Sequence, residues 1–259
     1  MKSIANSNEQ FWTVLNGQLV VRNLKVEEEA NRLGIHQRLH KGEIDEPVLI
    51  YHEINAWKSG WNADDCLYQA NDCLIRQGDH VVDLGGNIGI FSSFATKKGA
   101  EKVYAFEPVP QNFTLLSLNT NSNVVTSYKL AVGSEDNQLV HMDFDPTFPG
   151  GSSFVVDGKN SKEDAITITL DTLLNTGVIE RIDFLKIDIE GAEHYALQGI
   201  SDENLSNIRC ISMEMHENAI GKEESNKIYI RLKSLGFSDY TLREPDGNNI
   251  VWFRNKNIK

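Results

Sequence analysis

The chain has 259 residues and carries 25 basic and 37 acidic side chains, which gives a formal net charge of −12. Its length favours one large domain with a terminal extension, and a hydrophobic share of 40 % excludes global disorder and fibrous structure. The acidic balance argues against a nucleic-acid partner, because phosphate backbones are bound by clustered cations. The three cysteines form no CxxC pair, so neither a zinc ribbon nor a disulfide framework is supported.

The N-terminal part has mixed patterns and no catalytic motif. It lacks the apolar run of a signal peptide, and no stretch of about 18 apolar residues occurs, so we expect no transmembrane segment and a cytoplasmic location. The turn pair Asn16-Gly17 predicts a hairpin over residues 11–21. We interpret residues 1–78 as an α+β extension that caps the main domain or mediates a homodimer. The other elements predicted here are helices over 24–33 and 62–77 and a strand over 47–51.

Strands and helices alternate from residue 79 onward, which predicts βαβ units, a mostly parallel sheet and a main α/β domain over residues 79–259. The tight turn Pro245-Asp246-Gly247 near the end predicts an antiparallel hairpin. The predicted elements are strands over 80–84, 102–106, 124–132, 183–188 and 208–214, helices over 88–98 and 110–121, and hairpin strands over 237–243 and 249–254.

Residues 138–170 interrupt this alternation and predict a strand, a long loop and another strand. Loops of this length in compact domains are often functional. We therefore treat residues 144–161 as a candidate substrate gate with hinges at Gly150 and Gly151. A surface insertion without a function is the alternative.

The segment VVDLGGNIGIFS, residues 81–92, runs from a strand through a glycine-rich turn into a helix. Gly85 and Gly86 permit backbone angles and a close ligand approach that a Cβ would prevent, and Gly89 lets the helix pack near the sheet. The N–H groups at the start of the helix then face a ligand. Asp83 at the strand end would repel a pyrophosphate, which favours a ligand with a cationic group. A tight turn without a ligand is the alternative.

The segment VYAFEP ends the next strand with Glu107, 18 residues after Gly89. An acid near this offset commonly accepts hydrogen bonds from ribose hydroxyls, although a solvated surface carboxylate is the alternative. Together with Asp83 and the glycines, Glu107 indicates an adenosine-containing cofactor with a positively charged tail. That cofactor is S-adenosyl-L-methionine.

The segment DFLKIDIEGAEHYALQGI, residues 183–200, delivers Asp188 to the carboxyl end of an apolar strand, where open α/β sheets bind ligands. Glu190 follows at the start of a helix and is either a cap or a site residue. We expect Glu193 and His194, one turn later, to face solvent or the core.

The segment ISMEMHE ends the following strand with Glu214 and His216. Strand alternation puts these two side chains on one face of the sheet. They can serve catalysis, substrate binding or packing.

These segments resemble the FkbM family of S-adenosylmethionine-dependent methyltransferases. The resemblance covers about residues 79–220 and rests on VVDLGGNIGIFS, VYAFEPVPQNF, LAVGSEDNQ and DFLKIDIEGAEHYALQGI, of which the last is the most specific. It implies the Rossmann-like class I methyltransferase fold with seven strands. It also implies O-methylation, often of sugar hydroxyls in glycans, glycolipids or secondary metabolites. The residues that match the family's cofactor-binding positions are Asp83, Gly85, Asn87, Gly89 and Glu107, and Asp188 matches the acid of its K-I-D-x-E-G signature.

Methyl transfer from a sulfonium is an in-line displacement, so the protein mainly supplies positioning. An alcohol acceptor still has to lose its proton to a base within hydrogen-bond reach. Our hypothesis is that Asp188 is this base or orients the acceptor hydroxyl, with His216 and Glu214 as the next candidates. We expect no metal at these side chains, because carboxylates at strand ends are commoner than metal sites. The alternative is a divalent cation that joins Asp188, Glu214 and His216. Activity that EDTA leaves unchanged would exclude this alternative.

Two other classes of function are compatible with parts of the sequence. A nicotinamide-dependent oxidoreductase is suggested by the Y-x-x-x-K match of Tyr229 and Lys233, although an amphipathic surface helix explains this match better. A methyltransferase-like scaffold without catalysis would be expected to lack Asp83 or the glycines. Equilibrium binding of S-adenosylmethionine and of NAD separates the two enzyme classes.

Overall fold

The computed structural model describes residues 10–15, 18–23, 66, 68–120, 123–145, 148–153, 161–243 and 249–259. The chain divides into two compact units, residues 1–66 and 67–259. In the first unit, β1 (Gln10–Leu15) pairs antiparallel with β2 (Gln18–Asn23), which confirms the predicted hairpin. The predicted helix over 24–33 and strand over 47–51 lie outside the described residues. The division into an extension over 1–78 and a main domain over 79–259 stays a prediction.

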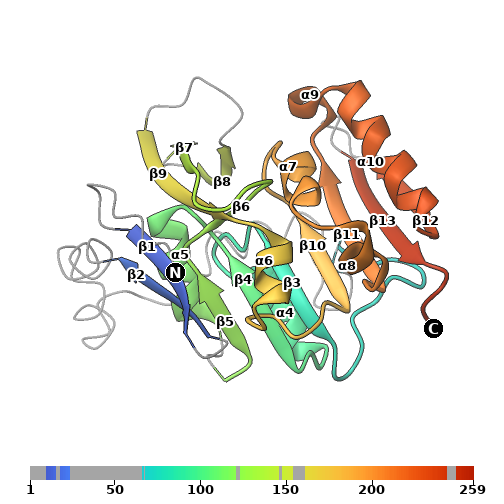
Figure 1. Cartoon of the computed structure of the whole chain (residues 1–259), viewed down its shortest axis with the longest axis horizontal. Helices are drawn as coiled ribbons and strands as arrows, with labels where there is room; N and C mark the ends of the chain where they lie inside the picture. Colours follow the sequence, from blue (N-terminus) through green and yellow to red (C-terminus); the bar gives the residue numbers. More distant parts are fainter. Residues whose placement is uncertain are drawn as a thin grey trace. The chain divides into compact units, whose positions relative to one another are not determined.

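A seven-stranded sheet in the order β12-β13-β11-β10-β3-β4-β5 forms the centre of the second unit (Figure 1). The five strands from β11 to β5 in this order are parallel, and β13 is antiparallel to both β11 and β12. The mostly parallel sheet with a C-terminal antiparallel hairpin is therefore confirmed. The strands are β3 (His80–Leu84), β4 (Lys102–Phe106), β5 (Val125–Tyr128), β10 (Phe184–Ile187), β11 (Cys210–Met215), β12 (Phe237–Arg243) and β13 (Asn249–Asn255).

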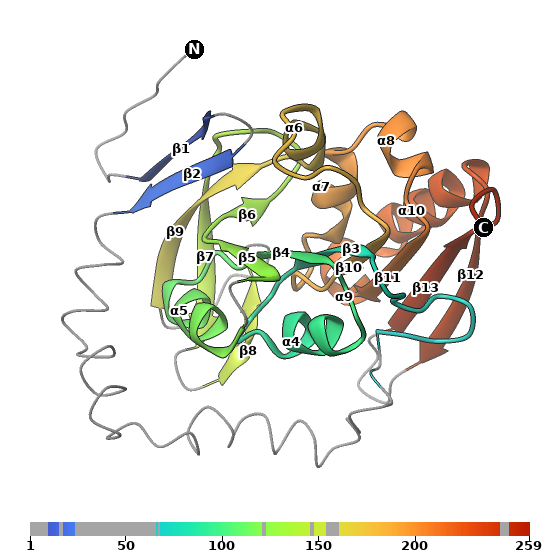
Figure 2. The same cartoon turned by 90° about the horizontal axis from the view of Figure 1, so that it is seen from below.

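Helices cover both faces of this sheet, as parallel strands require. Figure 2 shows α4 (Ile90–Lys97) and α5 (Pro110–Asn119) on one side, and α6 (Leu170–Asn175), α7 (Glu193–Gln198) and α8 (Asp202–Ser206) on the other. The short α9 (Glu217–Ile220) leads into α10 (Lys222–Ser234), which packs on α7 and β12. None of the helices in the described ranges is long and apolar enough to cross a bilayer.

A second sheet of four strands has the order β6-β9-β7-β8. Its strands are β6 (Ala131–Val132), β7 (Leu139–Asp145), β8 (Phe148–Ser153) and β9 (Ser161–Ile168). The single strand predicted over 124–132 is wrong, because the chain leaves the large sheet after β5 and pairs with β9 in the second sheet. The loop predicted over 144–161 is also wrong in part: β8 pairs antiparallel with β7, so Gly150 and Gly151 lie in a strand.

The helix predicted over 62–77 is wrong wherever the structure describes this segment. Residues 68–78 form turns and one isolated bridge between Ala70 and Cys73. Asn71 has a φ of 54°, which no helix accommodates. The segment instead sends side chains onto the large sheet, where the Cys73 thiol reaches the carbonyls of Ile211 and Phe253. The three cysteines are free.

Candidate active site

The turn between β3 and α4 depends on its glycines. Gly85 has a φ of 76°, and a Cβ on it would lie 1.8 Å from the backbone oxygen of Asp188. A Cβ on Gly86 would lie 2.3 Å from a methyl group of Leu116, and Gly89 has a φ of 91°. The N–H groups of Gly85 and Gly86 both donate to the Phe106 carbonyl. This segment therefore brings the ends of β3, β4 and β10 into direct contact.

A cavity lies at these strand ends and, with its mouth, holds about 590 Å³ of empty space. One wall is apolar and includes Leu130, Val132 and Met142, the last contributed by the four-stranded sheet. The polar lining includes the predicted cofactor-binding residues Gly85, Asn87 and Glu107, the predicted catalytic residue Asp188, and also Asn112 and Glu190. The structure thus brings one predicted catalytic carboxylate and much of the predicted cofactor-binding set to one cavity.

Glu107 is held by backbone donors on both sides. Its Oε2 accepts from the Asn87 N–H at 2.9 Å, and its Oε1 accepts from the Val109 N–H at 2.8 Å. Burial raises the pKa of Glu107 to about 7, against the opposing effect of the two N–H donors. The carboxylate is therefore fixed in place and is poised to titrate near neutral pH.

Asp83 lies beneath the glycine turn rather than in the cavity lining. Its side chain is 0 % exposed; one oxygen accepts from the Ser92 hydroxyl at 2.7 Å, and the other lies 3.2 Å from the Lys186 ammonium. The Asp83 carboxylate is therefore not among the groups that line the cavity, although its charge was predicted to face the ligand. Asp83 supports the turn from below, and Lys186 balances its charge.

Lys186 is a buried cation on β10 (Phe184–Ile187) and was not among the predicted site residues. Its ammonium donates to the carbonyls of Leu84 (3.2 Å) and Gly85 (2.7 Å), and it lies 3.5 Å from Asp188 Oδ2 and 5.2 Å from the Tyr68 ring centre. Burial alone would lower the pKa of Lys186, but the carboxylates of Asp83 and Asp188 raise it above its ordinary value. Residues two positions apart on a strand lie on the same face of the sheet, so the sequence alone predicts that Lys186 and Asp188 are neighbours.

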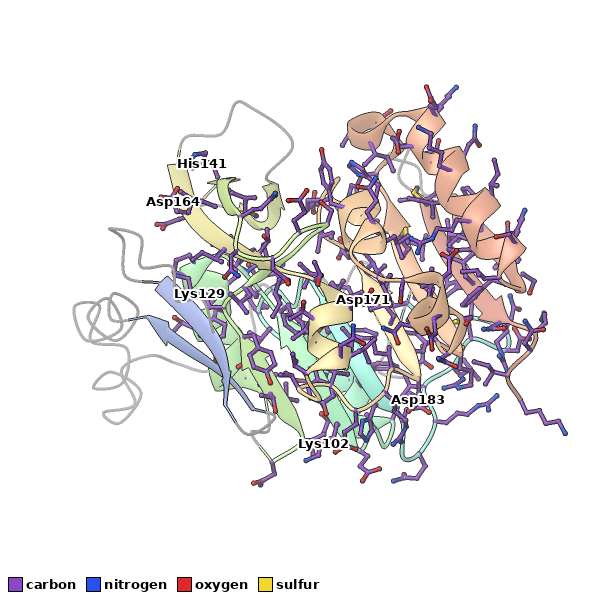
Figure 3. All side chains as sticks on the ribbon, in the orientation of Figure 1. Lys102, Lys129, His141, Asp164, Asp171 and Asp183 are labelled. Carbon is purple, nitrogen blue, oxygen red and sulfur yellow. The ribbon has the colours of Figure 1, made fainter. Side chains whose placement is uncertain are left out.

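Lys186→Met is expected to destabilise the fold strongly, because it leaves Asp83 buried without a counter-charge. Breaking a buried pair in this way costs about 3–5 kcal/mol of unfolding free energy. Lys102→Met, at the exposed start of β4 (Figure 3), is the matched control and should stay within about 0.5 kcal/mol of wild type. Urea unfolding of both variants measures the difference; equal unfolding free energies would contradict the structural role of Lys186.

Asp188 and Glu214 end neighbouring strands, and one phenol joins them. The Tyr68 hydroxyl lies 2.7 Å from Asp188 Oδ2 and 3.1 Å from Glu214 Oε2, and it can donate to either oxygen. Burial and the two carboxylates raise the pKa of Tyr68 well above its ordinary value, so the phenol keeps its proton. Tyr68 comes from the segment before β3, and no local sequence signal places it beside residues 120 positions later.

His216 is the centre of a carboxylate cluster at the end of β11. Its Nδ1 donates to Glu193 at 2.8 Å, and its Nε2 lies 3.6 Å from both Glu190 and Glu214. Burial would lower the pKa of His216, but the hydrogen bond and charge of Glu193, with further carboxylates including Asp188 and Glu190, raise it to about 9. Glu214 and His216 do share one face, as predicted from strand alternation.

Glu193 faces the core, which is one of the two placements expected from the sequence, and Glu190 lines the cavity. Glu193 is 0 % exposed and, besides His216, accepts from the Gly191 N–H at 3.0 Å. Glu190 precedes α7 in a left-handed conformation, with a φ of 55°, and points its carboxylate at His216 rather than capping the helix. Asp188, Glu214 and His216 each offer one donor atom, and these three atoms lie within 4.8 Å of one another, which is a geometry that could hold a metal ion.

The Y-x-x-x-K match lies on the surface helix α10, as the sequence interpretation preferred. The Lys233 ammonium lies 5.8 Å from the Tyr229 ring centre and 3.0 Å from Asp239. The match therefore contributes nothing to the cavity described above.

The strand order, the terminal antiparallel pair and the glycine turn after β3 define the class I methyltransferase fold. The chain belongs to the FkbM methyltransferase family, whose methyltransferase FkbM domain matches residues 83–238. It is accordingly a methyltransferase.

Several curated relatives are similar over much of their length. Methyltransferase 1 from Beauveria bassiana is 27 % identical over 190 residues, which cover 64 % of this chain and 74 % of that protein. The 31-O-demethyl-FK506 methyltransferase FkbM from Streptomyces tacrolimicus is 28 % identical over 202 residues, covering 65 % and 76 %. Hexuronic acid methyltransferase AglP from Haloferax volcanii is 28 % identical over 142 residues, covering 53 % and 56 %.

Among solved structures, a methyltransferase FkbM from Methylobacillus flagellatus KT is 19 % identical with a TM-score of 0.49. The match covers 68 % of this chain but only 43 % of that longer chain.

Proposed function

We propose that this protein is an S-adenosyl-L-methionine-dependent O-methyltransferase that acts on a hydroxyl group, with a sugar as the favoured acceptor. The observation that carries the proposal is the meeting of Asn87, Glu107 and Asp188 around one cavity at the carboxyl ends of parallel strands. Open α/β sheets bind their ligands at this edge. The hexuronic acid methyltransferase among the relatives supports a sugar acceptor.

The residues present fit the proposed cofactor. The Asn87 side-chain oxygen is buried, lines the cavity and lacks a hydrogen-bond partner among the described residues, so it is available to a ligand donor. A Cβ on Gly85 or Gly86 would fill space that the turn needs for its close approach to other elements. Glu107, Asn87 and the glycine turn would hold the cofactor, and Glu107 would accept from ribose hydroxyls.

S-adenosylmethionine, when bound, supplies a methyl group that its sulfonium already activates. The protein then has to orient the acceptor and take up the hydroxyl proton. Asp188 is the favoured residue for this, because its carboxylate lines the cavity at the strand end. Glu214 and His216, beside Asp188, are the next candidates. The carboxylates of Asp188, Glu190 and Glu214 outnumber the nearby cations, which favours a positively charged ligand even though Lys186 balances Asp83.

Calorimetric binding of S-adenosylhomocysteine, compared with NAD, tests the cofactor. We expect saturable binding of the former at one site per chain and none of the latter. Incubation with S-adenosylmethionine and a panel of sugars and uronic acids should then give S-adenosylhomocysteine and a product heavier by one CH₂ unit. Binding of NAD alone would favour the oxidoreductase alternative, and cofactor binding without turnover on any acceptor would favour the scaffold.

The affinity for S-adenosylhomocysteine is expected to depend on pH through Glu107. The pKa of about 7 means that Glu107 is protonated below neutral pH. The protonated carboxyl group is a poorer hydrogen-bond acceptor for ribose hydroxyls than the carboxylate is. Affinity should therefore rise with pH up to about 7, by as much as about tenfold per pH unit, and then level off. In Glu107→Gln, the affinity for S-adenosylhomocysteine should change by less than about tenfold between pH 5 and pH 8. An identical pH profile in wild type and variant would contradict this role of Glu107.

A further inference from the structure

The geometry points to a divalent-cation site formed by Asp188, Glu214 and His216 beside the cavity that Asp188 lines, with Mg²⁺ or Mn²⁺ as the ligand. The three side chains come from the carboxyl ends of the neighbouring parallel strands β10 and β11. One donor atom of each lies within 4.8 Å of the other two. That spacing is close to what one ion with metal–ligand distances of about 2.0–2.2 Å requires, so modest side-chain rotation closes it.

The imidazole is prepared for a ligand by a partner outside the set of three. Glu193 is 0 % exposed and accepts the Nδ1 proton of His216, which directs the Nε2 atom toward the other carboxylates. Metal-bound histidines almost always donate their second ring nitrogen to a carboxylate or a carbonyl in this way. His216 is only 7 % exposed, yet its Nε2 lies 3.6 Å from both Glu190 and Glu214, too far for a hydrogen bond. The Nε2 atom therefore points between two carboxylates, where a divalent cation would take the place of the proton on this nitrogen.

The carboxylates around His216 also carry enough negative charge to balance a divalent cation. Four carboxylates face this region, those of Asp188, Glu190, Glu193 and Glu214, and the ammonium of Lys186 is shared between Asp188 and Asp83. The Tyr68 hydroxyl supplies one proton to a pair of these carboxylates. Two carboxylates and one imidazole form a predominantly hard donor set, which suits Mg²⁺ and Mn²⁺ better than thiolate-preferring metals.

The consequence for catalysis rests on the proposed function. A cation held by these three side chains would bind the acceptor oxygen at an open position, polarise its O–H bond and fix its direction. Asp188 would bind the cation through one carboxylate oxygen and take up the acceptor proton on the other. Glu193 would be a positioning residue that acts through His216.

Manganese binding by the full chain tests the site without cofactor or acceptor. Protein freed of metal with EDTA and then desalted is titrated with Mn²⁺, and the six-line electron paramagnetic resonance signal of free Mn²⁺ is recorded. We expect one Mn²⁺ per chain. Glu214→Gln and His216→Gln should abolish this binding, and Glu193→Gln should weaken it by about 10–100-fold. No binding to wild type, or equal binding to all variants, would overturn the site.

The matched control is the exposed pair His141 and Asp164, which joins β7 to β9 and lies in the four-stranded sheet (Figure 3). His141→Gln with Asp164→Asn removes a histidine and a carboxylate 2.7 Å apart and should leave Mn²⁺ binding unchanged. If a site variant fails to fold, a measurement on the wild type alone still tests the site. Electron spin echo spectra of the Mn²⁺-loaded wild type are expected to show modulation from a bound imidazole nitrogen, and the absence of this modulation overturns the site.

Two further measurements separate this inference from the proposed function. Calorimetric S-adenosylhomocysteine binding and methyl transfer are measured before and after EDTA treatment. Intact cofactor binding with transfer that is lost and restored by Mg²⁺ supports the cation role. Transfer that is undiminished by EDTA overturns that role while the proposed function stands. Absent cofactor binding by a protein that binds Mn²⁺ overturns the proposed function while the metal site stands.

Discussion

Asp188→Asn is expected to lower kcat for methyl transfer by about 10²–10⁴-fold, because it removes the carboxylate best placed to take up or orient the acceptor proton. The amide keeps the shape of the side chain and a hydrogen-bond acceptor for Tyr68. Binding of S-adenosylhomocysteine should therefore change far less than kcat. Steady-state kinetics with saturating cofactor and calorimetric binding measure the two effects separately.

The matched control for Asp188 lies just before the other end of the same strand. Asp183 precedes β10 and accepts from the His80 N–H at 2.7 Å and from Arg181 at 2.9 Å, so its role is structural (Figure 3). Asp183→Asn should reduce the unfolding free energy by about 1.5–3 kcal/mol and leave kcat near wild type. If Asp188→Asn retains near-full turnover, or if Asp183→Asn loses as much turnover, Asp188 has no special chemical role.

Gly85→Ala should be the most damaging single methyl addition in the turn. Its left-handed backbone costs a non-glycine residue about 1–2 kcal/mol, and its Cβ would lie 1.8 Å from the Asp188 carbonyl oxygen. Backbone on both sides then has to move, which adds about 1–3 kcal/mol. We expect a total loss of about 2–5 kcal/mol in unfolding free energy, together with loss of S-adenosylhomocysteine binding.

Gly177 is a control that shares the backbone strain of Gly85 but lacks its close contact with another residue. It has a nearly equal φ of 73°, but a Cβ there would meet nothing within 4 Å. Gly177→Ala should therefore cost only the backbone strain of about 1–2 kcal/mol and keep cofactor binding intact. Urea unfolding and calorimetry on both variants make the comparison. Equal losses in the two variants would mean that close contact between the turn and Asp188 contributes nothing.

The elements that the sequence predicted correctly are those whose signals are local. The strand and glycine turn of residues 81–92 follow from a short apolar run and from the backbone freedom of glycine. The parallel sheet follows from alternating strands and helices, and the last hairpin follows from its tight turn. Glu107 and Asp188 were placed at the cavity because each directly follows a buried strand.

The elements that were missed depend on contacts between distant residues. Residues 68–77 look helical by pattern, but the chain instead brings Tyr68 to carboxylates 120 and 146 positions away. Glu193 was expected to face solvent or the core, but no local pattern predicts the hydrogen bond that it accepts from His216, 23 residues later. Asp83 reads as a ligand-facing acid because its partner Lys186 lies 103 residues later, beyond any local pattern.

The position of Tyr68 in the sequence determines where a recombinant fragment should start. The family match begins at residue 83 and the predicted main domain at residue 79, so a clone cut at either position would discard this aromatic ring. The shortened enzyme would expose Lys186 on the side that the ring now shields and would deprive two acidic groups of their shared phenol. Expression boundaries for biochemical work therefore belong upstream of the second compact unit, which begins at residue 67.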